Sequence, residues 1–326
     1  MKKILILLVS LAITAILLFI LLQDEDSETQ IKDLAESNKT ANSTSSIELE
    51  TPTVQKQADD STPLENEVQE EIKEQLPSNV CKEQLAEQYP DLDRQYHQII
   101  EEFYLNDEQM MGDGVYQNMS FEALKPLADS NDPNAMMVYG SDKIWHSATG
   151  IRISRSDSQY RTQEQTQEII KNHQIDLVGI SEGEDYLFRA AVFGKVGSVF
   201  ELSMLLDLAA RQMDRKEYKD NLIEDVLIKS HAYKKLLTNI FKNDEALKGV
   251  FLSSNDPFKN IQRLYADHED FEDIKIRIET GSEILYKELV RRWEHEREYY
   301  GFDIYPDYLQ GELEDYGNAY LECHLR

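Results

Sequence analysis

The pentapeptide Gly179-Ile180-Ser181-Glu182-Gly183 is the pattern in this chain most suggestive of covalent catalysis. It matches the G-x-S-x-G nucleophile elbow, in which a strand precedes the serine and a helix follows it, so that the hydroxyl is exposed at a sharp turn. Residues 174–178 could form that strand, and Glu184 onward could form that helix. The downstream histidines that could act as a base are His231, His268, His295 and His324.

The elbow belongs, however, to a parallel sheet, and few segments of this chain show the period-two alternation of strands. The same two glycines also suit a polar turn between helices, with Ser181 or Glu182 helping to cap one of them. We therefore predict that residues 179–183 form such a turn and that the chain has no catalytic residue. The alternative is a hydrolase that uses Ser181, or carboxylates that the sequence alone does not pair.

Metal and phosphate motifs are incomplete in this sequence. The run His295-Glu296-Arg297-Glu298 begins like the zinc motif H-E-x-x-H but lacks the second histidine. The run Gly194-Lys195-Val196-Gly197-Ser198 is too short for a phosphate-binding loop, and its lysine is misplaced. We expect no metal and no cofactor.

The two cysteines, Cys81 and Cys323, lie at the two ends of the segment that reads as folded. In an oxidising compartment an even pair of cysteines is expected to form a disulfide. We therefore predict a bond between Cys81 and Cys323, with two unpaired thiols as the alternative.

The C-terminal segment is rich in tyrosine and acidic residues. Amphipathic rings beside carboxylates can bind basic peptides or sugars. A tail of this kind can also pack over the last helix as a cap, and we favour that interpretation. The tyrosines considered for binding are Tyr299, Tyr300, Tyr305 and Tyr308.

Charge limits the classes of partner. The chain has 34 basic and 62 acidic residues, which gives a formal net charge of −28. Such a surface repels phosphate backbones, so nucleic acid is excluded as an expected partner. A basic protein partner would be attracted instead.

An apolar run covers residues 4–22 and follows the two lysines of Met1-Lys2-Lys3. At about 1.5 Å per residue it reaches roughly 28 Å, close to the thickness of one hydrocarbon core. It is longer than the apolar region of a cleavable signal peptide, and no small-x-small site follows it. We predict a single transmembrane anchor at 4–22, with residues 1–3 in the cytoplasm because of their lysines. The rest of the chain would then lie on the periplasmic side of a bacterial inner membrane.

Residues 23–79 read as a disordered acidic linker. The stretch from Asp24 to Val80 holds 15 acidic and 4 basic residues and has no aromatic residue or glycine. So polar a segment buries too little apolar surface to offset the entropy of its chain. Residues 80–326 would then form the exported domain.

Helical spacing recurs throughout this exported domain, so we predict an all-α fold of short helices. Asp132-Pro133 should begin a helix, because proline suits a first helical turn. Residues 184–193 place their apolar side chains on one stripe, and Gly194 can end that helix. The Thr280 and Glu283 pair has the spacing of a capping box and predicts another helix start.

Two stretches, Leu124–Gly140 and Tyr186–Gly194, together resemble Sel1-like repeats, which are relatives of the tetratricopeptide repeats. The resemblance covers roughly residues 120–212 and implies stacked helix hairpins, an α-solenoid whose members act as scaffolds or adaptors. It also implies that small residues let the helices approach closely. The residues assigned to this packing are Ala128, Ala135, Tyr139, Gly140, Ala190, Ala191 and Gly194.

These features predict a membrane-anchored envelope protein that binds another protein through a helical-repeat domain. A further alternative is an acidic inhibitor or immunity protein that neutralises a basic toxin or enzyme.

Overall fold

The computed structural model describes residues 78–103, 115–116, 118–153, 161–252 and 259–324. The contacts divide the chain into the units Met1–Glu71 and Ile72–Arg326, and the described residues belong to the second unit. The predicted anchor at 4–22 and nearly all of the predicted linker at 23–79 lie outside these residues. Within the described ranges, no helix combines the length and apolar character needed to cross a membrane.

The described part of the chain is helical and contains no strand, which confirms the all-α prediction. In chain order its helices are α2 (Ser78–Gln88), α3 (Pro90–Phe103), α5 (Phe121–Asp129), α6 (Pro133–Thr149), α7 (Gln163–Asn172), α8 (Leu177–Val192), α9 (Gly197–Arg215), α10 (Asp220–Ile240), α11 (Glu245–Leu252), α12 (Lys259–Tyr265), α13 (Phe271–Tyr300) and α14 (Glu312–His324).

Several predicted helix boundaries agree with the structure. Asp132 caps α6 by accepting hydrogen bonds from the backbone N–H groups of Asn134 and Ala135, and Pro133 opens the helix. The structure adds a cap that was not predicted, Ser120 of α5, which accepts from the N–H of Ala123. These caps satisfy N–H groups that have no partner inside a helix. The helix predicted over residues 184–193 is longer in the structure, because α8 begins at Leu177.

The closest helix contact joins α6 to α8 and depends on two glycines, one on each helix. A Cβ atom built on Gly140 would lie 2.8 Å from the carbonyl oxygen of Gly183, and one built on Gly183 would lie 2.6 Å from that of Gly140. Backbone therefore meets backbone, and no side chain larger than hydrogen fits between them. Around this contact the side chains of Ile144 and Leu187 are fully buried.

The residues assigned to repeat packing are mostly buried, as their assignment requires. Ala128, Ala135, Ala190 and Ala191 have no exposed surface, and Tyr139 is 2% exposed. Gly194 is the exception, since no atom lies within 4 Å of a Cβ built on it. Its φ of +108° shows that it ends α8 and is not a packing contact, because only glycine adopts this conformation without strain.

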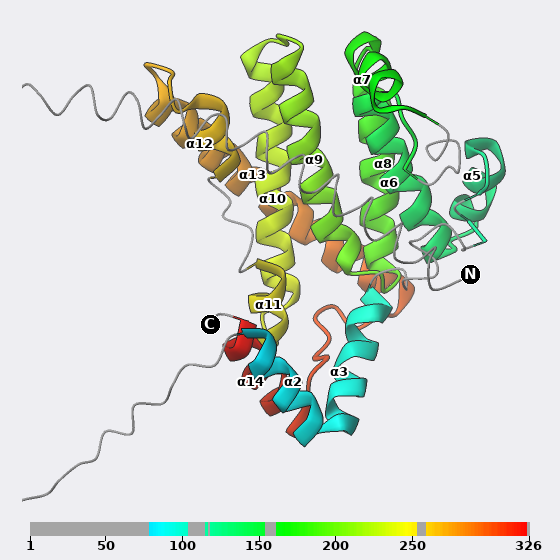
Figure 1. Cartoon of the computed structure of the whole chain (residues 1–326), viewed down its shortest axis with the longest axis vertical. Coiled ribbons are helices and arrows are strands. Elements are labelled where there is room, and N and C mark those ends of the chain that lie inside the picture. Colours follow the sequence, from blue (N-terminus) through cyan, green and yellow to red (C-terminus); the bar gives the residue numbers. More distant parts are fainter. Residues whose placement is uncertain (1–77, 104–114, 117, 154–160, 253–258, 325–326) are drawn as a thin grey trace, which may run out of the picture. The chain divides into compact units, whose positions relative to one another are not determined.

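Helices α9 and α10 run side by side, as Figure 1 shows, and bury an ion pair between them. Lys234 Nζ lies 2.9 Å from Asp207 Oδ2, and the two side chains are 6% and 5% exposed. Ser230 Oγ also donates to Asp207 at 2.6 Å. Removing one charge of such a pair would leave the other buried without compensation.

Helix α13 differs from the expected pattern of short helices. It extends over 30 residues, and it passes obliquely behind α10 and α8 (Figure 1). Thr280 and Glu283 lie inside it, so the prediction of a helix start there was wrong. Their spacing suits a capping box only where the chain enters a helix, and here the preceding turns are already helical because Ile274 and Ile278 are buried.

The two ends of the described domain meet. Helices α2 and α3 pack against α14, and the structure joins Cys81 of α2 to Cys323 of α14, with their Cα atoms 5.5 Å apart. The aromatic rings of Tyr96, Tyr316 and Tyr320 pack together beside this bond. The disulfide thus closes a loop of 242 residues in sequence separation.

We predict that Gly183→Ala destabilises the domain, although alanine is about 1 kcal/mol better than glycine inside a helix. The added methyl group meets a backbone carbonyl that cannot rotate away, and overpacking of this kind costs about 1–3 kcal/mol. The measurement is urea unfolding followed by circular dichroism. Ser181→Ala, at an exposed position of the same helix, is the matched control and should change stability by less than about 0.5 kcal/mol. A Gly183→Ala protein as stable as the control would contradict the close contact.

We predict that reducing the disulfide lowers the free energy of unfolding. The loop-entropy relation gives roughly 5 kcal/mol for so long a loop, as an upper figure. Urea unfolding with and without reductant measures the effect, and non-reducing peptide mapping identifies the bond. The Cys81→Ser/Cys323→Ser double variant is the control, since its stability should not respond to reductant. Two free thiols in protein taken from its native compartment would refute the pairing.

Candidate functional site

Ser181 lies in the first turns of α8 with its side chain exposed. Residues 174–176 form no strand, and Asp176 caps the helix by accepting from the N–H groups of Val178 and Gly179. Both interpretations of residues 179–183 were therefore wrong about the backbone, because the segment is neither an elbow nor a turn. The spacing of its glycines serves the contact with α6, where Gly179 and Gly183 are buried.

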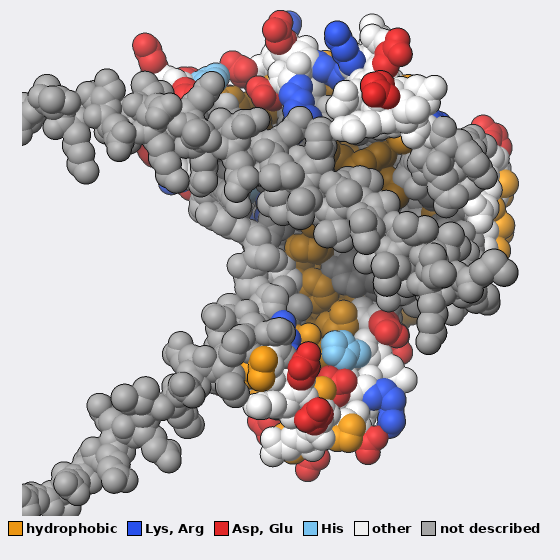
Figure 2. Space-filling view, viewed as in Figure 1, with side chains coloured by type: hydrophobic (Ala, Val, Ile, Leu, Met, Phe, Trp, Pro, Cys, Tyr) orange, Lys and Arg blue, Asp and Glu red, His pale blue; other side chains and the backbone are white. Residues whose placement is uncertain are grey.

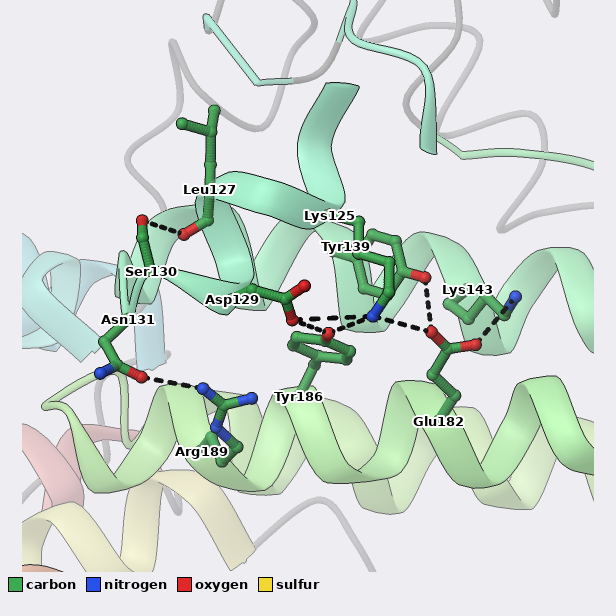
Figure 3. A network of polar contacts seen from close by, with 10 residues as sticks. All are labelled: Lys125, Leu127, Asp129, Ser130, Asn131, Tyr139, Lys143, Glu182, Tyr186 and Arg189. Atoms are coloured by element: carbon green, nitrogen blue, oxygen red, sulfur yellow. Dashed lines mark hydrogen bonds and ion pairs between the residues drawn. The ribbon is translucent and has the colours of Figure 1, made fainter. Parts of the chain in front are cut away.

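A network of polar side chains connects α5, α6 and α8, and Figure 3 shows it. Lys125 Nζ donates to the Tyr186 hydroxyl at 2.5 Å, and that hydroxyl in turn donates to Asp129. Glu182 accepts from the Tyr139 hydroxyl at 2.7 Å and pairs with Lys143 at 3.1 Å. We call this group, Lys125, Asp129, Tyr139, Lys143, Glu182 and Tyr186, the polar clasp.

The polar clasp unites the two stretches that resemble Sel1-like repeats. Lys125, Asp129 and Tyr139 come from the first stretch, and Tyr186 comes from the second. At its edge Arg189 donates to Asn131 at 2.8 Å. Residues that the sequence spaces far apart are thus brought together because α8 packs along α6.

The protonation of the polar clasp does not suit acid–base catalysis at neutral pH. Burial raises the pKa of both tyrosines, Tyr139 and Tyr186, so each hydroxyl stays protonated. The hydrogen bond to Tyr186 raises the pKa of Lys125. Burial acts to raise the pKa of Glu182, but the bonds from Tyr139 and Lys143 outweigh it and hold that pKa below its ordinary value. The clasp groups satisfy one another and act as a structural contact.

Glu201 on α9 is the described carboxyl group whose pKa comes nearest to neutrality. Burial raises its pKa to about 7, while the neighbouring Ser141 hydroxyl opposes that shift. Hydrolysis by carboxylates requires two of them with pKa values pushed apart. The groups that set the pKa of Glu201 do not include a second carboxylate, so the hydrolase alternative gains no acid–base pair here.

A second feature lies beside α7, where an open hollow is lined by Gly150, Arg161, Gln165, Glu168, Ile169, Asn172 and His173. The His173 ring is held by a hydrogen bond between its Nε2 and the carbonyl oxygen of Ser147, 2.9 Å long. No described group of three or more His, Cys, Asp or Glu is arranged to hold a metal ion.

Two of the tyrosines considered for binding are used inside the fold. The Tyr305 hydroxyl donates to Glu294 at 2.7 Å, and Lys242 Nζ lies 3.3 Å from the centre of its ring. The Tyr308 ring meets that of Phe103 at 4.6 Å, and the Tyr308 N–H donates to Asp244. For this pair the cap interpretation describes the contacts, since both side chains are partly buried and packed inside the fold.

The other two tyrosines are exposed and belong to an aromatic cluster. Tyr299 is 74% exposed and Tyr300 41% exposed, while Phe302 is 38% exposed. The ring of Tyr300 lies 4.6 Å from that of Phe193, which follows the end of α8, and Phe193 contacts Phe302 at 5.6 Å. We call these four residues, Phe193, Tyr299, Tyr300 and Phe302, the aromatic corner.

Two matching helix ends build the aromatic corner. After α8, the N–H of Gly194 bonds to the carbonyl of Ala191, and the N–H of Lys195 bonds to that of Ala190. After α13, the N–H groups of Gly301 and Phe302 bond to the carbonyls of Glu298 and Arg297 in the same pattern. Both are Schellman motifs with a left-handed glycine, at φ +108° and +74°.

Arg297 fixes the two helix ends to each other. Its Nη1 donates to the carbonyl of Val192, the last residue of α8, at 2.8 Å, and its Nε donates to the carbonyl of Asp303 at 2.7 Å. Its side chain is buried, with 6% of the residue exposed. The bond to Val192 satisfies a carbonyl at a helix end that has no partner within its helix. The two helix ends that carry the corner are therefore fixed to each other by a buried side chain.

Sequence reasoning identified Tyr299 and Tyr300 but missed Phe193 and Phe302. The signal was present in the sequence, because an aromatic residue precedes a glycine at both Phe193-Gly194 and Tyr300-Gly301. What the sequence does not contain is the fact that the two helix ends lie beside each other.

Comparison of the chain with protein-family models, with curated proteins and with solved structures finds no match. The resemblance to Sel1-like repeats therefore remains a proposal.

We predict that Glu182→Gln destabilises the domain at neutral pH but not at low pH. The folded pKa of Glu182 lies below its ordinary value, so its stabilising effect is present above pH about 4.5 and is lost as the pH falls through the folded pKa. The effect should be at most about 1 kcal/mol, because the side chain is partly exposed. Urea unfolding of both proteins between pH 3 and 8 measures it. A constant difference across this range would contradict the role assigned to the carboxylate.

Proposed function

We propose that this chain is a membrane-anchored envelope protein that binds another protein through its helical domain. Residues 4–22 would be the anchor, residues 23–79 the linker, and residues 80–326 the binding module on the periplasmic side. We propose further that the module is a solenoid of stacked hairpins similar to Sel1-like repeats. The packing of α6 against α5, α8 and α9 supports this arrangement.

The aromatic corner is the observation that carries the proposal. Aromatic rings exposed together on a rigid support are typical of protein interfaces, where Tyr, Trp and Arg supply most of the binding energy. Phe193 and Phe302 pack against Tyr300, Tyr299 packs against Tyr300, and Arg297 fixes the two helix ends that carry these rings. The polar clasp and the Asp207–Lys234 pair are by contrast satisfied internally.

Charge supports a basic partner. Residues 81–326 contain 28 basic and 47 acidic residues, a net charge of −19. On the face shown in Figure 2, acidic side chains lie around α2, α3 and α14 and along the opposite edge. A field of this sign accelerates the approach of a basic protein, and the acceleration falls with ionic strength.

We predict that a photo-crosslinking residue, benzoylphenylalanine, placed at Tyr299 captures a specific protein in membranes of the native cell. The same residue at Val178, which is 79% exposed on α8, is the matched control and should capture nothing. Capture at position 299 should weaken as salt rises from about 0.05 to 0.5 M, where the screening length shrinks severalfold. Equal products from both positions, or none from position 299, would contradict the proposal.

The runner-up is an envelope hydrolase that acts through Ser181. We predict that Ser181 does not react with a fluorophosphonate probe, because it lies on a helix and no base has been found beside it among the described residues. Labelling that Ser181→Ala abolishes would make the hydrolase the better proposal.

The acidic inhibitor alternative predicts the same capture but a different partner. The captured protein would be a basic enzyme or toxin, and binding would remove its activity. Assaying the captured protein with and without this chain separates an inhibitor from an adaptor.

A further inference from the structure

We infer that the aromatic corner receives an arginine side chain from a basic segment of the partner protein. This inference rests on the proposed function and adds the chemistry of the ligand. Three observations lead to it: how this chain uses its own cations, which rings remain free of them, and which charges surround those rings.

The chain repeatedly places its own cations over aromatic rings. The guanidinium of Arg292 lies 4.1 Å from the centre of the Phe188 ring, and that of Arg152 lies 4.2 Å from the centre of the Phe121 ring. Lys242 covers Tyr305, as described above. Such contacts are electrostatic, since the face of an aromatic ring carries partial negative charge.

Three of the four rings of the aromatic corner lack such a cation. Within the described residues, the structure records none over Phe193, Tyr299 or Tyr300. Phe302 has the guanidinium of Arg297 at 5.1 Å, but that group is buried and bonded to two backbone carbonyls. Tyr299 and Tyr300 are thus the two exposed rings of the corner without a cation.

The exposed charges adjacent to Tyr299, Tyr300 and Phe302 in the sequence are negative, whereas the positive charge at the corner belongs to the buried Arg297. The run from Glu298 to Asp303 is exposed throughout, has an acidic residue at each end and contains no basic residue. The nearest basic residue on the other helix end is Lys195, which is partly buried and has Glu102 close enough to act on its charge. An incoming cation would therefore meet the exposed rings of Tyr299 and Tyr300 in a segment that has an exposed acidic residue at each end.

The geometry favours arginine over lysine. The rings of Tyr299 and Tyr300 stand at 83° to each other with their centres 5.0 Å apart, so they present faces in two directions. A planar guanidinium can stack on one face while its N–H groups bond to a carboxylate. A lysine ammonium is more strongly hydrated and cannot stack in this way.

The test uses the purified full-length chain and three labelled peptides of alternating glycine and one other residue. That residue is arginine, lysine or citrulline, the last being the neutral analogue of arginine. Fluorescence polarisation at low salt measures the dissociation constants. We expect the arginine peptide to bind about tenfold more tightly than the citrulline peptide, with the lysine peptide between them.

The double variant Tyr299→Leu/Tyr300→Leu keeps apolar side chains but removes both ring faces. It should lose most of the preference for arginine while its circular dichroism is unchanged, since both residues are exposed. Tyr89→Leu is the matched control, because Tyr89 is 44% exposed and lies elsewhere, beside the acidic Asp91 and Asp93. It should keep the full preference.

Equal binding of the three peptides, or a preference that survives in the double variant, would overturn the inference. If position 299 crosslinks a partner while the peptides bind equally, the arginine inference fails and the binding-module proposal stands. If the preference for arginine is present but no partner crosslinks, the inference is supported and the binding-module proposal fails.

Discussion

The close approach of α6 and α8 at Gly140 and Gly183 is the constraint on which the rest of the structure depends. With a carbonyl oxygen less than 3 Å from the place of each missing Cβ, only glycine allows this distance between the helix axes. The contact fixes the height and rotation of α8 along α6. Everything that α8 carries, from the capping Asp176 to Phe193 at its end, takes its position from that alignment.

The same alignment positions both the polar clasp and the aromatic corner. They differ in whether their side chains already have partners within the domain. In the polar clasp, each ionisable group on α8 meets a partner from α5 or α6, so the charges are used to hold the helices. The aromatic corner at the end of α8 is ordered by backbone hydrogen bonds and by Arg297, and its tyrosines Tyr299 and Tyr300 stay exposed. Side chains that are already ordered but still exposed suit a binding surface. Binding then costs little side-chain conformational entropy.

The aromatic corner also shows how helix endings can place side chains. A Schellman motif ends a helix with a left-handed residue, usually glycine, and so fixes where the residue just before it lies. Two such endings lie together here because α13 is long enough to cross from α10 to the end of α8. A shorter α13 would leave Phe193 without Tyr300 beside it.

The sequence by itself determined the helical class, the start of α6 at Asp132-Pro133 and the end of α8 at Gly194, because these depend on residues adjacent in the chain. It also singled out Cys81 and Cys323 as a pair, and Tyr299 and Tyr300 as exposed candidates. The turn predicted at Gly179 and Gly183 was wrong, since the sequence alone does not distinguish a glycine that ends a helix from a glycine that lets another helix pack closely. Only the tertiary structure decided between them, because the second role depends on α6, more than thirty residues away in the sequence. The polar clasp and the meeting of Phe193 with Tyr300 were decided in the same way, by which helices pack together and not by what each helix contains.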